Sequence, residues 1–226
     1  MMRYWLRINS KKNINALLST DVFKYKYFWN YEISEVSSQS PIMEIVSFLK
    51  KNQTSLFENN IKSENMSVWI NYEYEKDCRF SLSHEELKSL GDLGIPLCFS
   101  CWEKGTTLDL SYDNSNLDEE ITEYILKIKT DKNPNDFFSK KNFHFDNGLW
   151  CYQTDNVIFG IHELVSFLKK NQKHIFSNGI TPKDINICFY YEYLSECSWE
   201  FISKEMKELG DIKIDLNIVC MKKDRN

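Results

Sequence analysis

A long internal repeat constrains this chain more than any other feature of its sequence. Residues 45–53 read IVSFLKKNQ, and residues 164–172 read LVSFLKKNQ. At this offset of 119 residues, the stretches 42–101 and 161–220 align without a gap. A repeat of this length predicts that one folding unit is present twice in tandem.

The repeat predicts the domain organisation. We expect a first module at residues 1–105, a linker at 106–120 and a second module at 121–226. With 226 residues and 42% hydrophobic content, the chain is long enough for two cores of ordinary size. We therefore expect each module to fill its own interior.

Hydrophobic periodicity predicts the elements of each module. Residues 66–74 alternate between apolar and polar side chains, which is typical of a half-buried strand, whereas 42–57 carry apolar residues at helical spacing. Ser83-x-x-Glu86 is a capping box, and we expect its helix to stop at Gly91.

Further elements surround these. Asn13 and Asn133 signal a short helix, residues 25–31 form an aromatic strand or hairpin, Asn147-Gly148 marks a turn in the second copy, and 95–101 forms a closing strand. The predicted fold class is α+β: two tandem copies of a small two-layer module, each with a mostly antiparallel or mixed sheet and helices on one face.

Composition points to a cytosolic protein. No apolar run approaches the roughly 20 residues that span a bilayer, and residues 1–8 lack the features of a signal peptide. Seven cysteines, an odd number scattered through apolar strands, favour buried reduced thiols over a disulfide framework.

The net charge of −5 comes from one short segment. Each predicted module is neutral, and the excess lies in the linker. The residues are Asp109, Asp113, Asp118, Glu119 and Glu120. A chain without a basic excess lacks the electrostatic footprint of nucleic-acid binding, so we expect no direct contact with nucleic acid. The same acids are our candidate partner-binding residues.

A site used by both copies should appear in both, and no histidine meets this test. We therefore expect no catalytic residue, metal or cofactor. Cys98 and Cys101 have redox or zinc spacing, but residues three apart in a strand point to opposite faces. Only Cys101 recurs, as Cys220, and we interpret it as a core residue. Cys78 and Cys197 also recur, and we interpret them as packing at strand ends.

The laid-out module resembles a bacterial family of small domains of unknown function. The matching features are an opening strand, the Asn-x-Asn helix start (Asn13, Asn133), a tryptophan-bearing strand (Trp29, Trp150) and the LVSFLKKN helix. The closing strand of the first copy departs from the pattern, with Ile95-Pro-Leu for Ile-Asp-Leu. Such families are similar to immunity proteins encoded beside polymorphic or contact-dependent growth inhibition toxins, and the resemblance carries over no catalytic residue.

Three functions remain open from the sequence. The first is a cytosolic immunity protein that occludes a cognate toxin domain, with the acidic linker facing the basic groove of a nuclease. The second is a small-molecule-binding or regulatory module with a pocket between the repeats or on its tyrosine-rich strands. The third, an enzyme acting through an unrepeated Cys or His, ranks last.

Overall fold

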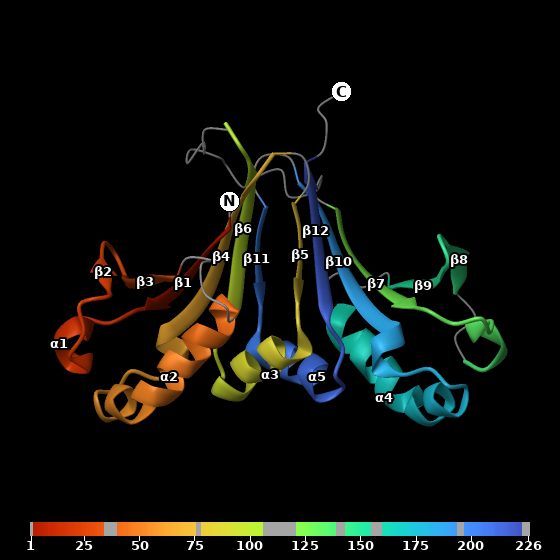
Figure 1. The fold of residues 1–226 in the computed structure, drawn as a ribbon, viewed down its shortest axis with the longest axis horizontal. Helices are drawn as coiled ribbons and strands as arrows, with labels where there is room; N and C mark the ends of the chain where they lie inside the picture. Colours follow the sequence, from red (N-terminus) through yellow and green to blue (C-terminus); the bar gives the residue numbers. More distant parts are fainter. Residues whose placement is uncertain are drawn as a thin grey trace.

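The computed structural model describes most of the chain. The described residues are 2–33, 40–75, 78–105, 121–138, 143–154, 160–193 and 197–222. Within them the protein is α+β, with five α-helices and two mixed six-stranded sheets (Figure 1). The linker 106–120, with all five candidate acids, lies outside the described residues.

Sheet A has the strand order β11-β6-β4-β1-β3-β2. Its strands are β1 (Met2–Ile8), β2 (Lys24–Tyr25), β3 (Trp29–Ile33), β4 (Met66–Tyr74), β6 (Leu97–Glu103) and β11 (Cys197–Phe201). Strands β4 and β6 are parallel, and the other neighbours are antiparallel.

Sheet B has the order β5-β12-β10-β7-β9-β8. Its strands are β5 (Cys78–Leu82), β7 (Ile121–Ile128), β8 (His144–Asp146), β9 (Leu149–Thr154), β10 (Ile185–Tyr193) and β12 (Leu216–Lys222). Here β10 and β12 form the parallel pair. The two sheets therefore share one connectivity pattern.

Each sheet contains one strand from the other half of the chain. Strand β5 follows β4 of sheet A in sequence but pairs with β12 of sheet B, and β11 likewise leaves β10 to pair with β6. Strand β5 cannot pair with β4, because β1 and β6 already occupy the two edges of β4. The sequence analysis missed β5 and β11 as separate strands.

The expectation of a separate interior for each half is wrong. The buried apolar residues of both halves form one cluster. Phe99 of sheet A lies 6.0 Å from Phe189 of sheet B and 5.7 Å from Phe80, measured between ring centroids. The central strands of the two sheets therefore pack face to face, as in a sandwich.

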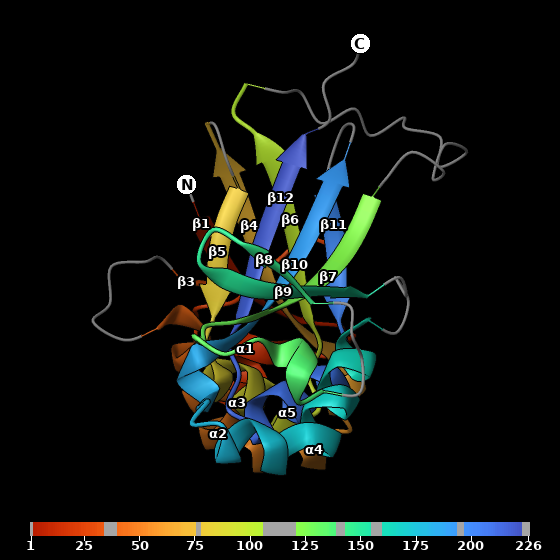
Figure 2. The same cartoon turned by 90° about the vertical axis from the view of Figure 1, so that its right-hand side faces the viewer.

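The helices lie on the inner side of the sheets and toward one end of the molecule (Figures 1 and 2). They are α1 (Ile14–Leu18), α2 (Pro41–Glu58), α3 (His84–Leu93), α4 (Gly160–Ser177) and α5 (Ser203–Asp211). The repeated segment, residues 45–53 and 164–172, lies in α2 and α4. The buried residues of both helices are part of the common core. None of the described helices is long and apolar enough to cross a membrane.

Helices α3 and α5 cross in direct contact, and this corrects the predicted helix stop. Gly91 lies inside α3, and the helix ends at Gly94, whose φ of 70° provides the left-handed cap. A Cβ on Gly91 would lie 2.5 Å from the Lys207 backbone nitrogen, and one on Gly210 would lie 2.4 Å from Lys88 Cβ. Both glycines are required for the close approach of the two helices.

Two of the predicted helix starts are confirmed, and a third is not. The Ser83–Glu86 capping box is present, and the Asn13 side chain accepts a hydrogen bond from the Ala16 amide at the start of α1. The matching Asn133 begins a 3₁₀ turn (Pro134–Asp136) instead of an α-helix.

The second asparagine of each Asn-x-Asn pair has a different role. The Asn15 side chain donates to the Phe23 carbonyl (2.8 Å) and accepts from the Phe23 amide (3.0 Å). Asn135 makes the same two bonds to Phe143. Each asparagine thereby ties the loop that leads into an aromatic hairpin, β2–β3 or β8–β9.

The predicted turn of the second hairpin is also confirmed. Asn147 and Gly148 both have positive φ angles, 48° and 81°, between β8 and β9. This is the backbone of a type I′ turn, for which Asn-Gly is the preferred pair.

Candidate functional site

Three tryptophans lie together on the outer face of sheet A. Trp5 of β1 is opposite Trp69 of β4, and Trp102 of β6 is opposite Glu73 of β4. All three side chains are half-buried. The described helices lie on the inner side of the sheet, so none of them covers this surface (Figure 1). We call Trp5, Trp69, Trp102, Arg3 and Arg7 the tryptophan face.

Arg7 packs against this aromatic surface. Its guanidinium carbon lies 4.1 Å from the centroid of the Trp69 ring and 6.0 Å from that of Phe28. Burial lowers the pKa of Arg7 from its ordinary value. Within the described residues, Arg7 Nε and Trp5 Nε1 are buried without a hydrogen-bond partner. The Arg7 cation is therefore held against the Trp69 ring, with donors still to be satisfied.

A hollow of about 220 Å³ opens at one end of the tryptophan face. Its lining residues are Arg3, Trp5, Asn71, Glu73 and Trp102. Two aromatic walls with a cation, a carboxylate and an amide between them suit a planar or hydrogen-bonding group of a ligand.

The outer face of sheet B differs at the matching positions. Ile125 lies opposite Cys188 where sheet A has Trp5 opposite Trp69, and Met221 lies opposite Glu192 where sheet A has Trp102 opposite Glu73. The tryptophan face is therefore a property of sheet A alone. The three tryptophans do not recur in the second half of the sequence, so the repeat did not point to them.

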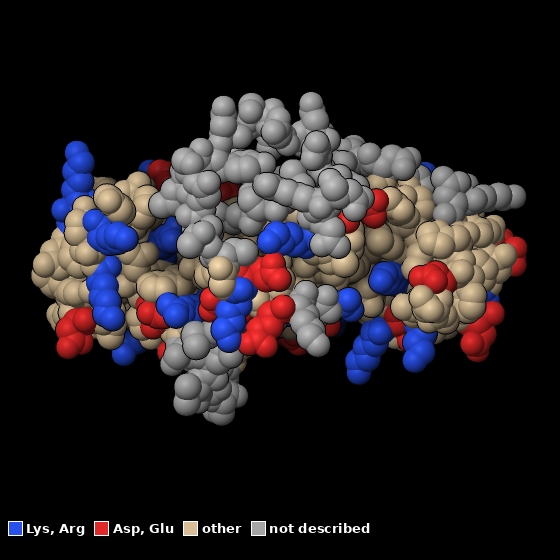
Figure 3. Space-filling view, turned by 90° about the horizontal axis from the view of Figure 1, so that it is seen from above, with Lys and Arg blue, Asp and Glu red and all other residues tan. Residues whose placement is uncertain are grey.

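In the view from above, the lysines and arginines that can be seen are interspersed with acids (Figure 3).

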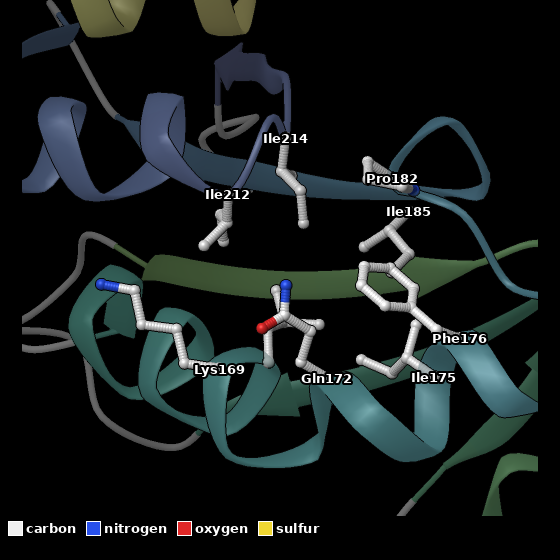
Figure 4. Close-up of a pocket in the computed structure, with 9 residues that line it drawn as sticks. Lys169, Gln172, Ile175, Phe176, Pro182, Ile185, Ile212 and Ile214 are labelled. Atoms are coloured by element: carbon white, nitrogen blue, oxygen red, sulfur yellow. The ribbon is translucent and has the colours of Figure 1, made fainter.

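A second hollow lies in the second half, between α4 and the strands and loop after it (Figure 4). Its volume is about 30 Å³, and Ile175, Phe176, Ile185, Ile212 and Ile214 form much of its wall. Lys169 lies at one end, and the Gln172 amide lies among the apolar side chains. A space of this size holds about one water molecule and no metabolite. Neither this hollow nor the first lies between the halves, where a pocket was expected.

Four cysteines converge between the two sheets. Cys78 lies opposite Cys220 in sheet B, and Cys197 lies opposite Cys101 in sheet A. Across the sheets, the Sγ atoms of Cys78 and Cys101 are 2.7 Å apart, and those of Cys197 and Cys220 are 3.3 Å apart. The sulfurs of Cys78, Cys101 and Cys220 all lie within 4.8 Å of one another. All four residues are 0% exposed. We call them the thiol cluster.

Hydrogen bonds and burial act in opposite directions on the thiols of the cluster. Burial raises the pKa of the Cys197 thiol. Hydrogen bonds from neighbouring sulfurs lower the pKa of Cys220, to which Cys197 Sγ donates, whereas burial opposes its ionisation.

Two tyrosine hydroxyls accompany the thiol cluster. Tyr72 of β4 lies opposite Cys101, and Tyr74 follows it by two residues. In the same way, Tyr191 of β10 lies opposite Cys220, and Tyr193 follows it by two residues. Both are nearly fully buried, at 4% and 0% exposed. Among the described residues, neither hydroxyl has a hydrogen-bond partner. Burial raises the pKa of Tyr74, and the nearby charges of Cys78, Cys101 and Cys197 act in the same direction.

The remaining sequence candidates do not join either site. Cys98 and Cys101 point to opposite faces of β6, as predicted, and Cys98 lies 3.7 Å from a Glu200 carboxylate oxygen on the outer face. His84 Nδ1 is 2.9 Å from Asp215 Oδ1, and His162 Nδ1 is 3.3 Å from Glu208 Oε2. Each of these histidines contacts a carboxylate near the surface.

The sequence contained a signal for the thiol cluster. Cys78 and Cys101 recur as Cys197 and Cys220, so this set passes the test of appearing in both copies. We interpreted the four as separate packing residues because the exchange of β5 and β11, which brings them together, was not foreseen. The tryptophan face gave no such signal, because it is not repeated.

Comparison with known proteins adds no identification: no family model, no curated protein and no solved structure matches the chain.

Proposed function

We propose that this protein is a cytosolic immunity-type binding protein, which occludes a cognate toxin domain through the tryptophan face of sheet A. The observation that carries the proposal is the grouping of Trp5, Trp69 and Trp102 with two arginines on a sheet surface that no described helix covers. Tryptophan and arginine are the residues most enriched among those that dominate protein–protein binding energy.

The geometry suits an anchor site for a partner. The Trp69 ring is held by Arg7, so little side-chain entropy is lost when a partner covers it. The buried donors Trp5 Nε1 and Arg7 Nε could be satisfied by acceptors on that partner. The hollow beside Trp102 would receive a projecting side chain.

The acidic segment supplements this surface in the proposal. Gly105 lies three residues after Trp102 in the sequence, and the acidic segment begins directly after Gly105. The segment contains Asp109 and Asp113. A partner with a basic groove, such as a nuclease domain, would be attracted by these charges, which act mainly on the association rate.

The test uses the protein encoded by the neighbouring reading frame. Its C-terminal domain would be expressed with and without this chain, and bacterial growth would report neutralisation. Trp69→Ala and Trp102→Ala should each weaken binding by about 30-fold or more, because truncating an interface anchor costs about 2 kcal/mol or more. Met221→Ala, at the matching position of sheet B, should leave binding unchanged.

Two outcomes would contradict the proposal. One is full protection by folded Trp69→Ala and Trp102→Ala variants, which would remove the tryptophan face. The other is the absence of any growth effect or complex with the neighbouring product. Neutralising the five acids should slow association and reduce its dependence on salt; unchanged kinetics would remove only the acidic segment.

The 220 Å³ hollow favours a second candidate, a small-molecule-binding or regulatory module. Its ligand would be a planar group stacked between Trp5 and Trp102, with Arg3 or Glu73 fixing its orientation. Thermal-shift screening against nucleotides and metabolites separates the two ideas, because stabilisation that is lost in Trp102→Ala and retained in Met221→Ala would favour the second.

We also propose that the matching connectivity of the two sheets arose by tandem duplication. The 119-residue sequence offset and the common strand order support this origin.

A further inference from the structure

The thiol cluster is built equally by both halves and by both sheets. Sheet A contributes Cys101 from the first half and Cys197 from the second, and sheet B contributes Cys78 and Cys220 in the same way. Four cysteines from four strands therefore lie close together in the inter-sheet core. Cys220 links the two close pairs, because its sulfur lies within 4.8 Å of those of Cys78 and Cys101 and 3.3 Å from that of Cys197.

The sulfurs lie close enough together to surround one metal ion. The sulfurs of Cys78, Cys101 and Cys220 lie within 4.8 Å of one another, and that of Cys197 lies 3.3 Å from Cys220 Sγ. A zinc ion with four sulfurs at about 2.3 Å requires sulfur–sulfur separations of roughly 3.8 Å. The separations of 2.7 Å for Cys78–Cys101 and 3.3 Å for Cys197–Cys220 are shorter, so both pairs would open by about 0.5–1 Å around the ion.

We propose that Cys78, Cys101, Cys197 and Cys220 bind one Zn²⁺ ion in a closed, structural site that joins the two halves of the protein. Four protein ligands leave no open position for water or substrate, so the site has no catalytic role. Zinc matches the soft ligand set and the tetrahedral geometry. The proposal does not depend on the tryptophan face, and either can fail without the other.

The two orphaned hydroxyls favour a charged site over neutral thiols or disulfides. Thiols and disulfide sulfurs accept hydrogen bonds weakly, whereas a metal-bound thiolate is a strong acceptor. Donation from Tyr74 and Tyr193 would offset the negative charge of a zinc ion with four thiolates. Tyr74 and Tyr193 lie on the strands paired with those of Cys101 and Cys220, so a thiolate at the cluster would offer their hydroxyls an acceptor.

An ion pair closes the site toward the ends of the strands. Glu103 and Lys222 follow Cys101 and Cys220 by two residues on β6 and β12, and Lys222 Nζ lies 3.1 Å from Glu103 Oε2. With every ligand fully buried, the metal must enter while the sheets come together. Binding and folding are therefore coupled, and exchange from the folded protein should be slow.

Metal analysis of the full chain tests the proposal directly. The protein would be purified under reducing conditions, passed through EDTA by gel filtration and analysed by mass spectrometry for metals. We expect about one zinc per chain, retained in EDTA and released when the protein is denatured. Metal-free folded protein with seven titratable thiols, or a mass showing two disulfides, would overturn the proposal.

Variants assign the ligands. Cys101→Ser and Cys220→Ser should each lose the metal, whereas Cys98→Ser and Cys188→Ser, at buried positions on the outer faces, should retain it. Retention in all four variants would contradict the assignment. Because a ligand variant could fail to fold, cobalt-loaded wild-type protein gives an independent measurement. Intense tetrahedral ligand-field bands with thiolate charge transfer support the site, and weak octahedral bands overturn it.

The hydroxyls are tested separately in a Tyr74→Phe, Tyr193→Phe double variant. Loss of both donors should speed metal release to a chelator by about tenfold, since changes in the shell around metal ligands typically cost that much or more. Unchanged release and an unchanged cobalt charge-transfer band would contradict donation to the sulfurs and remove the argument that the cluster is charged.

Discussion

The inner and outer faces of the two sheets differ in how closely the halves of the chain match. Inside, Gly91 and Gly210 serve the same helix crossing, and the thiol cluster draws two matching residues from each half. Outside, Trp69 faces solvent in sheet A where sheet B has Cys188. Inner positions contact the other half in matching ways, since Gly91 approaches Lys207 and Gly210 approaches Lys88, so a change on one side affects both halves. Outer positions lack this constraint, and we therefore place assembly inside and recognition outside.

Removing a ring from the inner side should have the largest effect. Phe189 is fully buried and lies 5.0 Å from the Trp199 ring and 6.0 Å from the Phe99 ring, between centroids. Phe189→Ala should lower the free energy of unfolding by about 3–5 kcal/mol, because it leaves a cavity between the sheets. Urea unfolding measures this. Trp69→Ala on the outer face should cost less than half as much, and equal losses would break the comparison.

The helix crossing tests whether inner positions are truly matched. Gly91→Ala places a methyl group against the Lys207 backbone and should lower the free energy of unfolding by about 2–3 kcal/mol. Gly210→Ala meets Lys88 in the same way and should cost a similar amount. Glu85→Ala, an exposed position on α3, is the control with little effect. A large difference between the two glycine variants would show that the crossing is asymmetric.

The loop asparagines extend the test to the hairpins. Asn15→Ala removes both bonds to Phe23 and leaves two backbone groups without their partner, at a cost of about 1–3 kcal/mol in the free energy of unfolding. Asn135→Ala should give the same loss through Phe143. Chemical denaturation of both variants measures the effect. Tolerance of either change would mean that its loop is held in another way.

The smallest expected effect depends on pH. Hydrogen bonds and charge from Lys207 and Lys88 lower the pKa of Asp92 in the folded protein. A lowered folded pKa means that Asp92 adds stability above its unfolded pKa of about 3.9, and that this is lost as the pH falls through the folded value.

Asp92→Asn should therefore weaken the fall in urea midpoint below about pH 4, and added salt should reduce the difference. An acid transition that is the same in Asp92→Asn as in the unchanged protein would contradict this assignment.

Local structure could be predicted from the sequence, but the partners of the strands could not. Ser83 with Glu86 and Asn147 with Gly148 determine their own backbone geometry, so the capping box and the turn were found. Period-two alternation shows that a strand has a buried face but does not show which sheet it joins. For that reason β5 was missed, and with it the thiol cluster.

The tryptophan face was missed for a different reason. The test of recurrence in both copies selects positions that share an environment, and Trp5, Trp69 and Trp102 do not recur. Their alternation with buried residues placed them on the polar side of their strands, where three large aromatic side chains are unusual. Three tryptophans on the polar side of predicted strands are therefore the signal in the sequence for this surface.

The strand exchange also sets an order for synthesis on the ribosome. Strand β5 is complete at Leu82, yet its partner β12 begins only at Leu216 and leaves the ribosome much later. Until then β5 lacks this partner, and such distant contacts slow folding. A nascent chain stalled before β12 should therefore expose β5 to chaperones, and a truncated first half should pair with a second copy of itself.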